Sequence, residues 1–139
     1  MSSDANCIFC KIVRGEMDAI KLYETAEILA FMDIMPQSPG HCLVIPKKHA
    51  PNLHEVSADD AATLIRATRH LAGAVNTALK PDGIGVYQFN GSAAGQTVFH
   101  IHFHIIPRRA GVDLAFHARS MADPAELQQI AQSIRAALG

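Results

Sequence analysis

One stretch of this chain decides its fold, and it reads His100-Ile101-His102-Phe103-His104-Ile105-Ile106-Pro107. Imidazole and apolar side chains alternate along it, and a period of two is the period of a β-strand. We therefore predict a strand that ends at Pro107, with the three histidines on one face and Ile101, Phe103 and Ile105 on the other. Such a strand has one face for the core and one face for chemistry.

The spacing of the histidines limits what they can bind together. In an extended strand the Cα atoms of His100 and His104 lie about 13 Å apart, so a single metal ion held by all three is not expected. An extended anion such as a chain of phosphoryl oxygens can be met by several rings in succession, because each ring offers a donor or an acceptor near neutral pH. The alternative is a histidine-rich strand on a solvated sheet face.

The residues just before the histidines are mostly small and polar, and they run Asn90-Gly91-Ser92-Ala93-Ala94-Gly95-Gln96-Thr97-Val98. A loop of small residues lets the backbone approach a ligand closely. Asn90, Gln96 and Thr97 add side-chain donors beside the histidines. Together the loop and the histidine strand predict a cradle for an anion.

The stretch from Asn90 to His104 closely resembles the histidine-triad nucleotide-binding family, whose motif is three histidines separated by single residues and followed by apolar ones. The resemblance extends to residues 7–11, 31–36 and 40–49, so it spans most of the chain. It resembles the bacterial branch of small nucleotide hydrolases and phosphoramidases rather than the larger uridylyl transferases, because the chain is short. The resemblance also implies a homodimer in which two sheets join into one.

The resemblance implies a covalent mechanism centred on His102. This histidine would attack the phosphorus of a nucleoside monophosphoryl group and form a nucleotidyl-imidazole that water then hydrolyses. An imidazole is largely unprotonated at pH 7, because its ordinary pKa is about 6.5. The other residues that the resemblance places near the phosphate and leaving group are His100, His104, His41, Asn90, Gln96, Thr97 and Val98.

The same resemblance implies a nucleoside cleft built by the N-terminal part of the chain. Asp33 matches a carboxylate that accepts hydrogen bonds from both ribose hydroxyls. Phe9, Phe31 and Ile34 would line an apolar cleft for the base, with a preference for purines. Ordinary explanations stand beside these roles, since an Asp here can begin a turn and the apolar residues can belong to the core.

Cys7 and Cys10 have the spacing that can present two sulfurs to one tetrahedral zinc ion, but the other two ligands must come from elsewhere. The resemblance implies that these are His49 and His100, as in some bacterial members with a structural zinc. In that case His100 orients the site rather than binding phosphate. Two free thiols and a redox pair are the alternatives. No organic cofactor is expected.

Length and composition bound the other possibilities. A chain of 139 residues with 49% hydrophobic content predicts one compact domain over residues 1–139. A net charge of -1 gives no broad attraction to nucleic acid or to an anionic membrane. No apolar run approaches the roughly 20 residues that span a bilayer, and the polar N-terminus lacks signal-peptide features. An odd number of cysteines favours reduced thiols, which fits a cytoplasmic protein. Cys42 is expected to be a core residue.

The rest of the pattern predicts an α+β fold of about five antiparallel strands with one long helix and a C-terminal helix. The helical segments are expected at 7–14, at 57–79 with Ser57 as N-cap, and from Pro124 after the cap Asp123. Strands besides the histidine strand are expected at 21–25, 28–33, 41–46 and 85–89, with a loop at 109–122. His54, His70 and His117 have no motif of their own.

The sequence therefore predicts a hydrolase for nucleoside monophosphates linked to amines, acyl groups or polyphosphates. A nucleotide-binding regulatory or scaffold module with little turnover is the alternative from another class. The intact triad together with Asn90, Gln96 and Thr97 favours chemistry. In a third interpretation, the histidines and cysteines buffer zinc and hold more than one ion per chain.

Overall fold

The structure is a computed structural model that describes residues 4–113 and 121–139. Its helices and strands follow one another along the chain as α1 (Ile8–Val13), β1 (Lys21–Glu24), β2 (Ile28–Met32), β3 (Cys42–Pro46), α2 (Ala58–Leu79), β4 (Gly83–Tyr87), the short 3-10 helix η1 (Ser92–Ala94), β5 (Phe103–Arg108) and α3 (Pro124–Leu138). The five strands form one antiparallel sheet in the order β1-β2-β3-β5-β4. The predicted α+β fold is confirmed.

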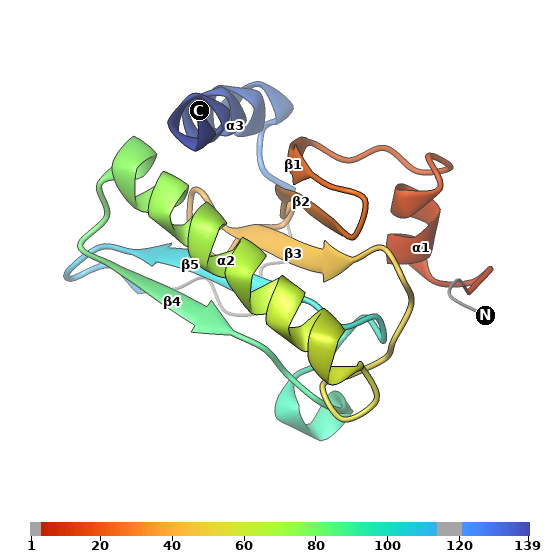
Figure 1. The fold of residues 1–139 in the computed structure, drawn as a ribbon. Helices are drawn as coiled ribbons and strands as arrows, with labels where there is room; N and C mark the ends of the chain where they lie inside the picture. Colours follow the sequence, from red (N-terminus) through yellow and green to blue (C-terminus); the bar gives the residue numbers. More distant parts are fainter. Residues whose placement is uncertain (1–3, 114–120) are drawn as a thin grey trace.

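Apolar side chains cover both faces of the sheet. Helix α2 crosses one face, and α3 packs beside α2 near β1 (Figure 1). The core on this helix face includes Ala30, Val44 and Ile105. The opposite face carries a second cluster that α1 covers, made of Phe9, Ile12, Leu29, Phe31, Leu43 and Ile45. Because β2 and β3 are buried at every position, both strands are apolar on both faces.

Helix α2 begins and ends through side-chain capping. The Ser57 hydroxyl accepts the Asp60 backbone N–H at 3.1 Å, as predicted. At the other end Lys80 adopts a left-handed conformation with a φ of 48°. The Arg109 guanidinium donates to the carbonyls of Leu79 and Lys80, both at 2.6 Å. These bonds satisfy carbonyls that have no partner inside the helix.

The histidine strand starts three residues later than predicted. Its ladder to β3 begins with the Val44–Phe103 pair. Before that pair, the Ile101 N–H donates to the Ala50 carbonyl at 2.8 Å, and the His100 ring donates to the Pro46 carbonyl at 2.7 Å. Loop and side-chain contacts therefore replace the ladder at His100–His102. The predicted alternation still holds, because Ile101, Phe103 and Ile105 pack in the helix-face core.

Pro107 lies within β5 and does not end it, contrary to the prediction. Strand β3 pairs with β5 only as far as Ile105, so beyond that residue β5 has one neighbour, β4. The Ser38 hydroxyl donates to the Pro107 carbonyl at 2.6 Å, which places this side of the backbone away from β4. The missing N–H of proline therefore removes no ladder hydrogen bond.

Strand β4 spans 83–87 and not the predicted 85–89, because it starts soon after the α2 cap and gives way to irregular backbone at Gln88. The other predicted strands and helices are present within one or two residues at each end. Cys42 is fully buried, as expected for a core residue. The predicted loop at 109–122 is described only in part, and His117 lies outside the described residues.

Candidate active site and metal centre

His102 is held with one ring nitrogen fixed by the backbone. Its Nδ1 lies 2.8 Å from the carbonyl oxygen of His100. A carbonyl can only accept, so Nδ1 carries the proton and Nε2 keeps its lone pair. The side chain is buried, with 6% of its surface exposed, between the rings of Phe9 and His104 at centroid distances of 5.1 and 4.8 Å. The unprotonated nitrogen is thus presented from a rigid, apolar setting.

A chain of hydrogen bonds also fixes the protons of His41 and His104. The Gln37 backbone N–H donates to Nδ1 of His41 at 3.0 Å, so the proton of His41 sits on Nε2. That Nε2–H points at Nδ1 of His104, 2.9 Å away, with an oxygen of Asp33 at 3.5 Å. Accepting this bond leaves the proton of His104 on Nε2. The sequence placed His41 near the triad, and the structure joins it directly to His104.

Burial keeps these imidazoles neutral. Removal from water, together with the neighbouring rings, lowers the pKa of His41 to about 4 and that of His104 to about 3. Burial also lowers the pKa of His102. Asp33 differs, because burial raises the pKa of its carboxyl while the Met35 backbone N–H, 2.9 Å from Oδ1, opposes the shift. At pH 7 the site therefore contains neutral rings beside one carboxylate.

Two of the predicted base-binding residues, Phe9 and Phe31, pack together beside His102. The rings of Phe9 and Phe31 meet edge to face with centroids 5.5 Å apart, and both are buried. Ile34 follows Asp33 and is 43% exposed. The two phenylalanines are part of the second core cluster, so they serve the fold in addition to any role toward a ligand.

The predicted amide donors are turned toward the protein itself. The Gln96 oxygen accepts the Gly91 N–H at 2.7 Å, and its nitrogen donates to the carbonyls of Pro51 and Val98 at 2.6 and 3.0 Å. The Asn90 oxygen accepts the Leu53 N–H and the Gln88 side-chain amide, both at 2.8 Å, while its nitrogen donates back to Gln88 at 3.0 Å. The two amides therefore hold the residues on either side of η1 against the segment between β3 and α2.

Backbone donors are present where the sequence predicted an anion cradle. Gly91 and Gly95 both have positive φ, 92° and 111°, which bends the loop around η1. Within the described residues, the backbone N–H groups of Thr97, Val98 and Phe99 have no acceptor. These groups immediately precede the histidines. Consecutive N–H groups of this kind are suited to phosphoryl oxygens.

Phe89 faces the triad and was missed by the sequence analysis, which singled out Asn90 instead. Its ring centroid lies 5.5 Å from that of His104, and the ring stacks with Tyr87 at an interplanar angle of 18°. Tyr87 pairs with His104 in the β4–β5 ladder. The period of two along β4, continued two residues beyond its end, would have identified both aromatics as neighbours of the histidines.

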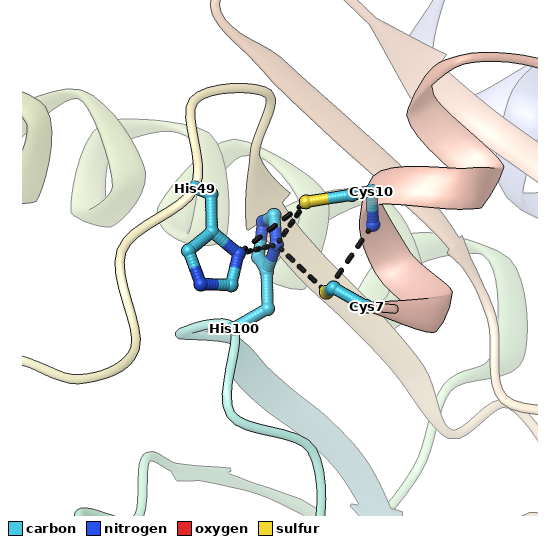
Figure 2. A group of neighbouring side chains, drawn as sticks. All are labelled: Cys7, Cys10, His49 and His100. Carbon is cyan, nitrogen blue, oxygen red and sulfur yellow. Dashed lines mark hydrogen bonds between the residues drawn. The ribbon is translucent and has the colours of Figure 1, made fainter. Parts of the chain in front are cut away.

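The four predicted metal ligands converge at one point (Figure 2). Nδ1 of His100 lies 3.4 Å from the Cys7 sulfur, 3.5 Å from the Cys10 sulfur and 3.2 Å from Nδ1 of His49, which is 3.3 Å from the Cys10 sulfur. Tetrahedral zinc with nitrogen and sulfur ligands needs donor separations of about 3.3 to 3.8 Å. The residues present therefore fit this ion.

Histidines of the motif enter two separate clusters, as their spacing predicts. His100 joins the cysteines, and His104 joins Asp33 and His41. Nε2 of His100 donates to the Pro46 carbonyl, so Nδ1 has its lone pair directed at the cysteines. Both nitrogens of His100 are thus occupied away from the side chain of His102.

No helix among the described residues is long and apolar enough to cross a membrane.

Known proteins similar to this chain share both its sequence and its fold. Residues 14–111 match the HIT domain model. The adenosine 5'-monophosphoramidase of Schizosaccharomyces pombe is 50% identical over 103 residues, which cover 74% of each chain. A Hit-like protein of Bartonella henselae has a TM-score of 0.89 at 46% identity, covering 96% of this chain and 98% of that one. A zinc-bound histidine triad protein of Mycobacterium smegmatis has a TM-score of 0.83 at 37% identity, covering 96% and 93%.

The hydrogen-bond chain predicts the proton positions and titrations of the imidazoles. In ¹⁵N-labelled protein at pH 7, we expect His102 as the Nδ1–H tautomer and His41 and His104 as the Nε2–H tautomers. On acidification, His41 and His104 should stay neutral until about pH 4 and 3. In urea the same rings should titrate near their ordinary pKa of about 6.5. A midpoint near 6.5 for His41 in the folded protein would contradict the network.

Proposed function

This chain belongs to the HIT family, and on that premise we propose that it hydrolyses nucleoside monophosphoryl compounds through a covalent intermediate on His102. The observation that carries the proposal is the bond from Nδ1–H of His102 to the His100 carbonyl. It fixes the tautomer that a nucleophilic Nε2 requires, and the buried ring stays neutral.

In this proposal, different surrounding residues bind the base, the ribose and the phosphoryl group of the substrate. Phe9, Phe31 and Ile34 hold the base, and the Asp33 carboxylate accepts from the ribose hydroxyls. The backbone N–H groups of 97–99 and Nε2–H of His104 donate to the phosphoryl oxygens, where negative charge develops. Gln96 and Asn90 act by fixing the loop that carries those donors, as their bonds to the backbone indicate.

The reaction proceeds in two displacements at phosphorus. The Nε2 lone pair of His102 forms a bond to phosphorus, and the leaving group departs with the electrons of the broken bond. A carboxylate or phosphate leaves as it is, while an amine takes one proton from water. Water then attacks phosphorus, the bond to Nε2 breaks, and the nucleoside monophosphate is released with the proton of the attacking water lost to solvent. Neutral His102 is restored.

Among the leaving groups, the amine is our first candidate. The Schizosaccharomyces pombe relative is named an adenosine 5'-monophosphoramidase. An adenosine phosphoramidate would place its purine against the phenylalanine pair and its single phosphoryl group at His102. Acyl-adenylates and dinucleoside polyphosphates use the same first displacement and differ only in what leaves.

The test of this proposal is the covalent adduct itself. Wild-type protein mixed with adenosine phosphoramidate and quenched without acid should show a mass increase of one adenylyl group that maps to His102. The His102→Ala variant should show no adduct and lose at least about 1,000-fold in turnover, as nucleophile removal typically does. Tight nucleotide binding without an adduct or turnover in the wild type would favour the regulatory binding module instead.

We also propose that Cys7, Cys10, His49 and His100 hold one structural zinc ion. The donor separations support this, as does a similar protein whose structure is zinc-bound. When bound, the ion would link α1 to the loops before α2 and β5. Two thiolates and two imidazoles would make up its coordination shell. His100 would then orient the site while its carbonyl holds His102.

Elemental analysis of the protein under native conditions should find one zinc per chain. The Cys10→Ala variant should lose it, whereas Cys42→Ala should keep it because Cys42 lies in the core outside the cluster. Chelation should lower the free energy of unfolding by about 2.7 kcal/mol or more, the stabilisation given by a ligand at about 100 times its Kd. More than one tightly held ion per chain would support the zinc-buffering interpretation.

A homodimer remains our proposal for the assembly. Strand β4 is an edge of the sheet, paired only with β5 within the described residues. On its helix face, Val86 is 47% exposed, and Ile65 on α2 is 50% exposed. A second copy that pairs along β4 would cover this edge and these side chains. Light scattering should give twice the mass of one chain, and a monomer mass would exclude the dimer.

A further inference from the structure

We propose that Tyr87 and Phe89 form a binding surface for a planar, aromatic leaving group, and we call this pair of rings the aromatic shelf. The inference rests on the proposed displacement at His102 and adds the class of substrate. It predicts that substrates whose amine carries an aromatic ring are preferred over those with a small aliphatic amine.

The position of the shelf follows from the strand register. Tyr87 lies directly opposite His104 in the β4–β5 ladder, and directly opposite residues project from the same face of a sheet. Phe89 follows two residues later, and its ring reaches His104 with a centroid distance of 5.5 Å. The shelf is therefore on the face of the sheet that carries the triad, next to its last histidine.

The orientation of the shelf depends on Gly85, which is two residues before Tyr87 on the same face. A Cβ atom at Gly85 would lie 2.6 Å from the Tyr87 hydroxyl oxygen, so the tyrosine ring lies back over the glycine. Tyr87 and Phe89 are nearly parallel, with centroids 6.1 Å apart and an interplanar angle of 18°. The two rings thus form one stacked aromatic pair.

Core packing does not account for the shelf. Neither Tyr87 nor Phe89 belongs to either apolar cluster of the described residues, and both rings are partly exposed. Ile84, on the other face of β4, differs because it packs against the helix-face core. Two stacked aromatic rings outside the core, one of which contacts His104, are suited to stacking with a ligand ring.

The order of the rings places the shelf where the leaving group should go. Rings contact one another in the sequence Phe31, Phe9, His102, His104, Phe89 and Tyr87. The nucleoside is proposed to occupy the end at Phe31 and Phe9, and the phosphoryl group the middle. In a displacement at phosphorus the leaving atom departs roughly in line and away from the attacking nitrogen. The remaining end of the row, at β4, is then left for the leaving group.

The test compares two adenosine phosphoramidates with amines of similar basicity, one N-benzyl and one N-allyl. Wild-type protein should favour the benzyl compound in kcat/KM. Phe89→Leu and Tyr87→Leu should each lower kcat/KM for the benzyl compound about tenfold, the loss typical of one stacking ring, and change that for the allyl compound less than about twofold. Tyr23→Leu is the matched control, because it removes an aromatic ring from β1, the opposite edge of the sheet, where Tyr23 contacts His70.

The outcomes separate this inference from the proposed function. Equal losses for both compounds in the shelf variants would show that the rings only support the fold of the site, and unchanged rates for both would show that they do not bind the leaving group. Either result overturns the shelf while leaving hydrolysis at His102 intact. Wild-type protein that turns over neither compound and forms no adduct overturns both proposals.

Discussion

The site depends on the placement of one buried residue, His100. Its Nε2–H binds the Pro46 carbonyl, its Nδ1 meets the two cysteine sulfurs, and its own carbonyl accepts from His102. A residue held at three points cannot turn, so the carbonyl that fixes His102 is itself fixed. The same contacts prevent β5 from starting at His100. The irregular backbone at this point is therefore what gives each of the first two histidines its own environment.

Desolvation sets the chemistry of the remaining rings. His41 and His104 share one hydrogen bond at 2.9 Å, and only one of the two facing nitrogens can carry the proton. A second proton in this bond would turn one ring into a buried cation and set two N–H groups against each other. Burial, followed by the neighbouring rings, lowers the pKa values of both histidines. The backbone N–H of Gln37 decides which nitrogen carries the proton. The backbone at Gln37 thus fixes the proton of His41 on Nε2, and through His41 it fixes the proton of His104 on Nε2.

Side-chain periodicity predicted much of this, and tertiary contacts account for the rest. The alternation from His100 to Ile106 correctly placed Ile101, Phe103 and Ile105 on the core side, and His100 and His104 join different side-chain clusters. The start of β5 could not be predicted, because it depends on the distant Pro46 and Ala50 carbonyls. Motif resemblance drew attention to Asn90. The side-chain oxygen of Asn90 accepts the N–H of Leu53, which is remote in sequence, while the ring of the adjacent Phe89 contacts His104.

The order of the strands places a different surface on each side of β5, the strand that carries His104. Strand β5 lies between β3 and β4, with β2 beyond β3. Asp33 and Phe31 belong to the β2 side, and Tyr87 belongs to β4. A phosphoryl group bound at His102 as proposed would therefore be flanked by two different surfaces, one that α1 helps to build and one that the edge strand provides. Because the edge surface lies outside both cores, its side chains are free to vary with the leaving group without loss of apolar packing, whereas Phe9 and Phe31 cannot change without disturbing the fold.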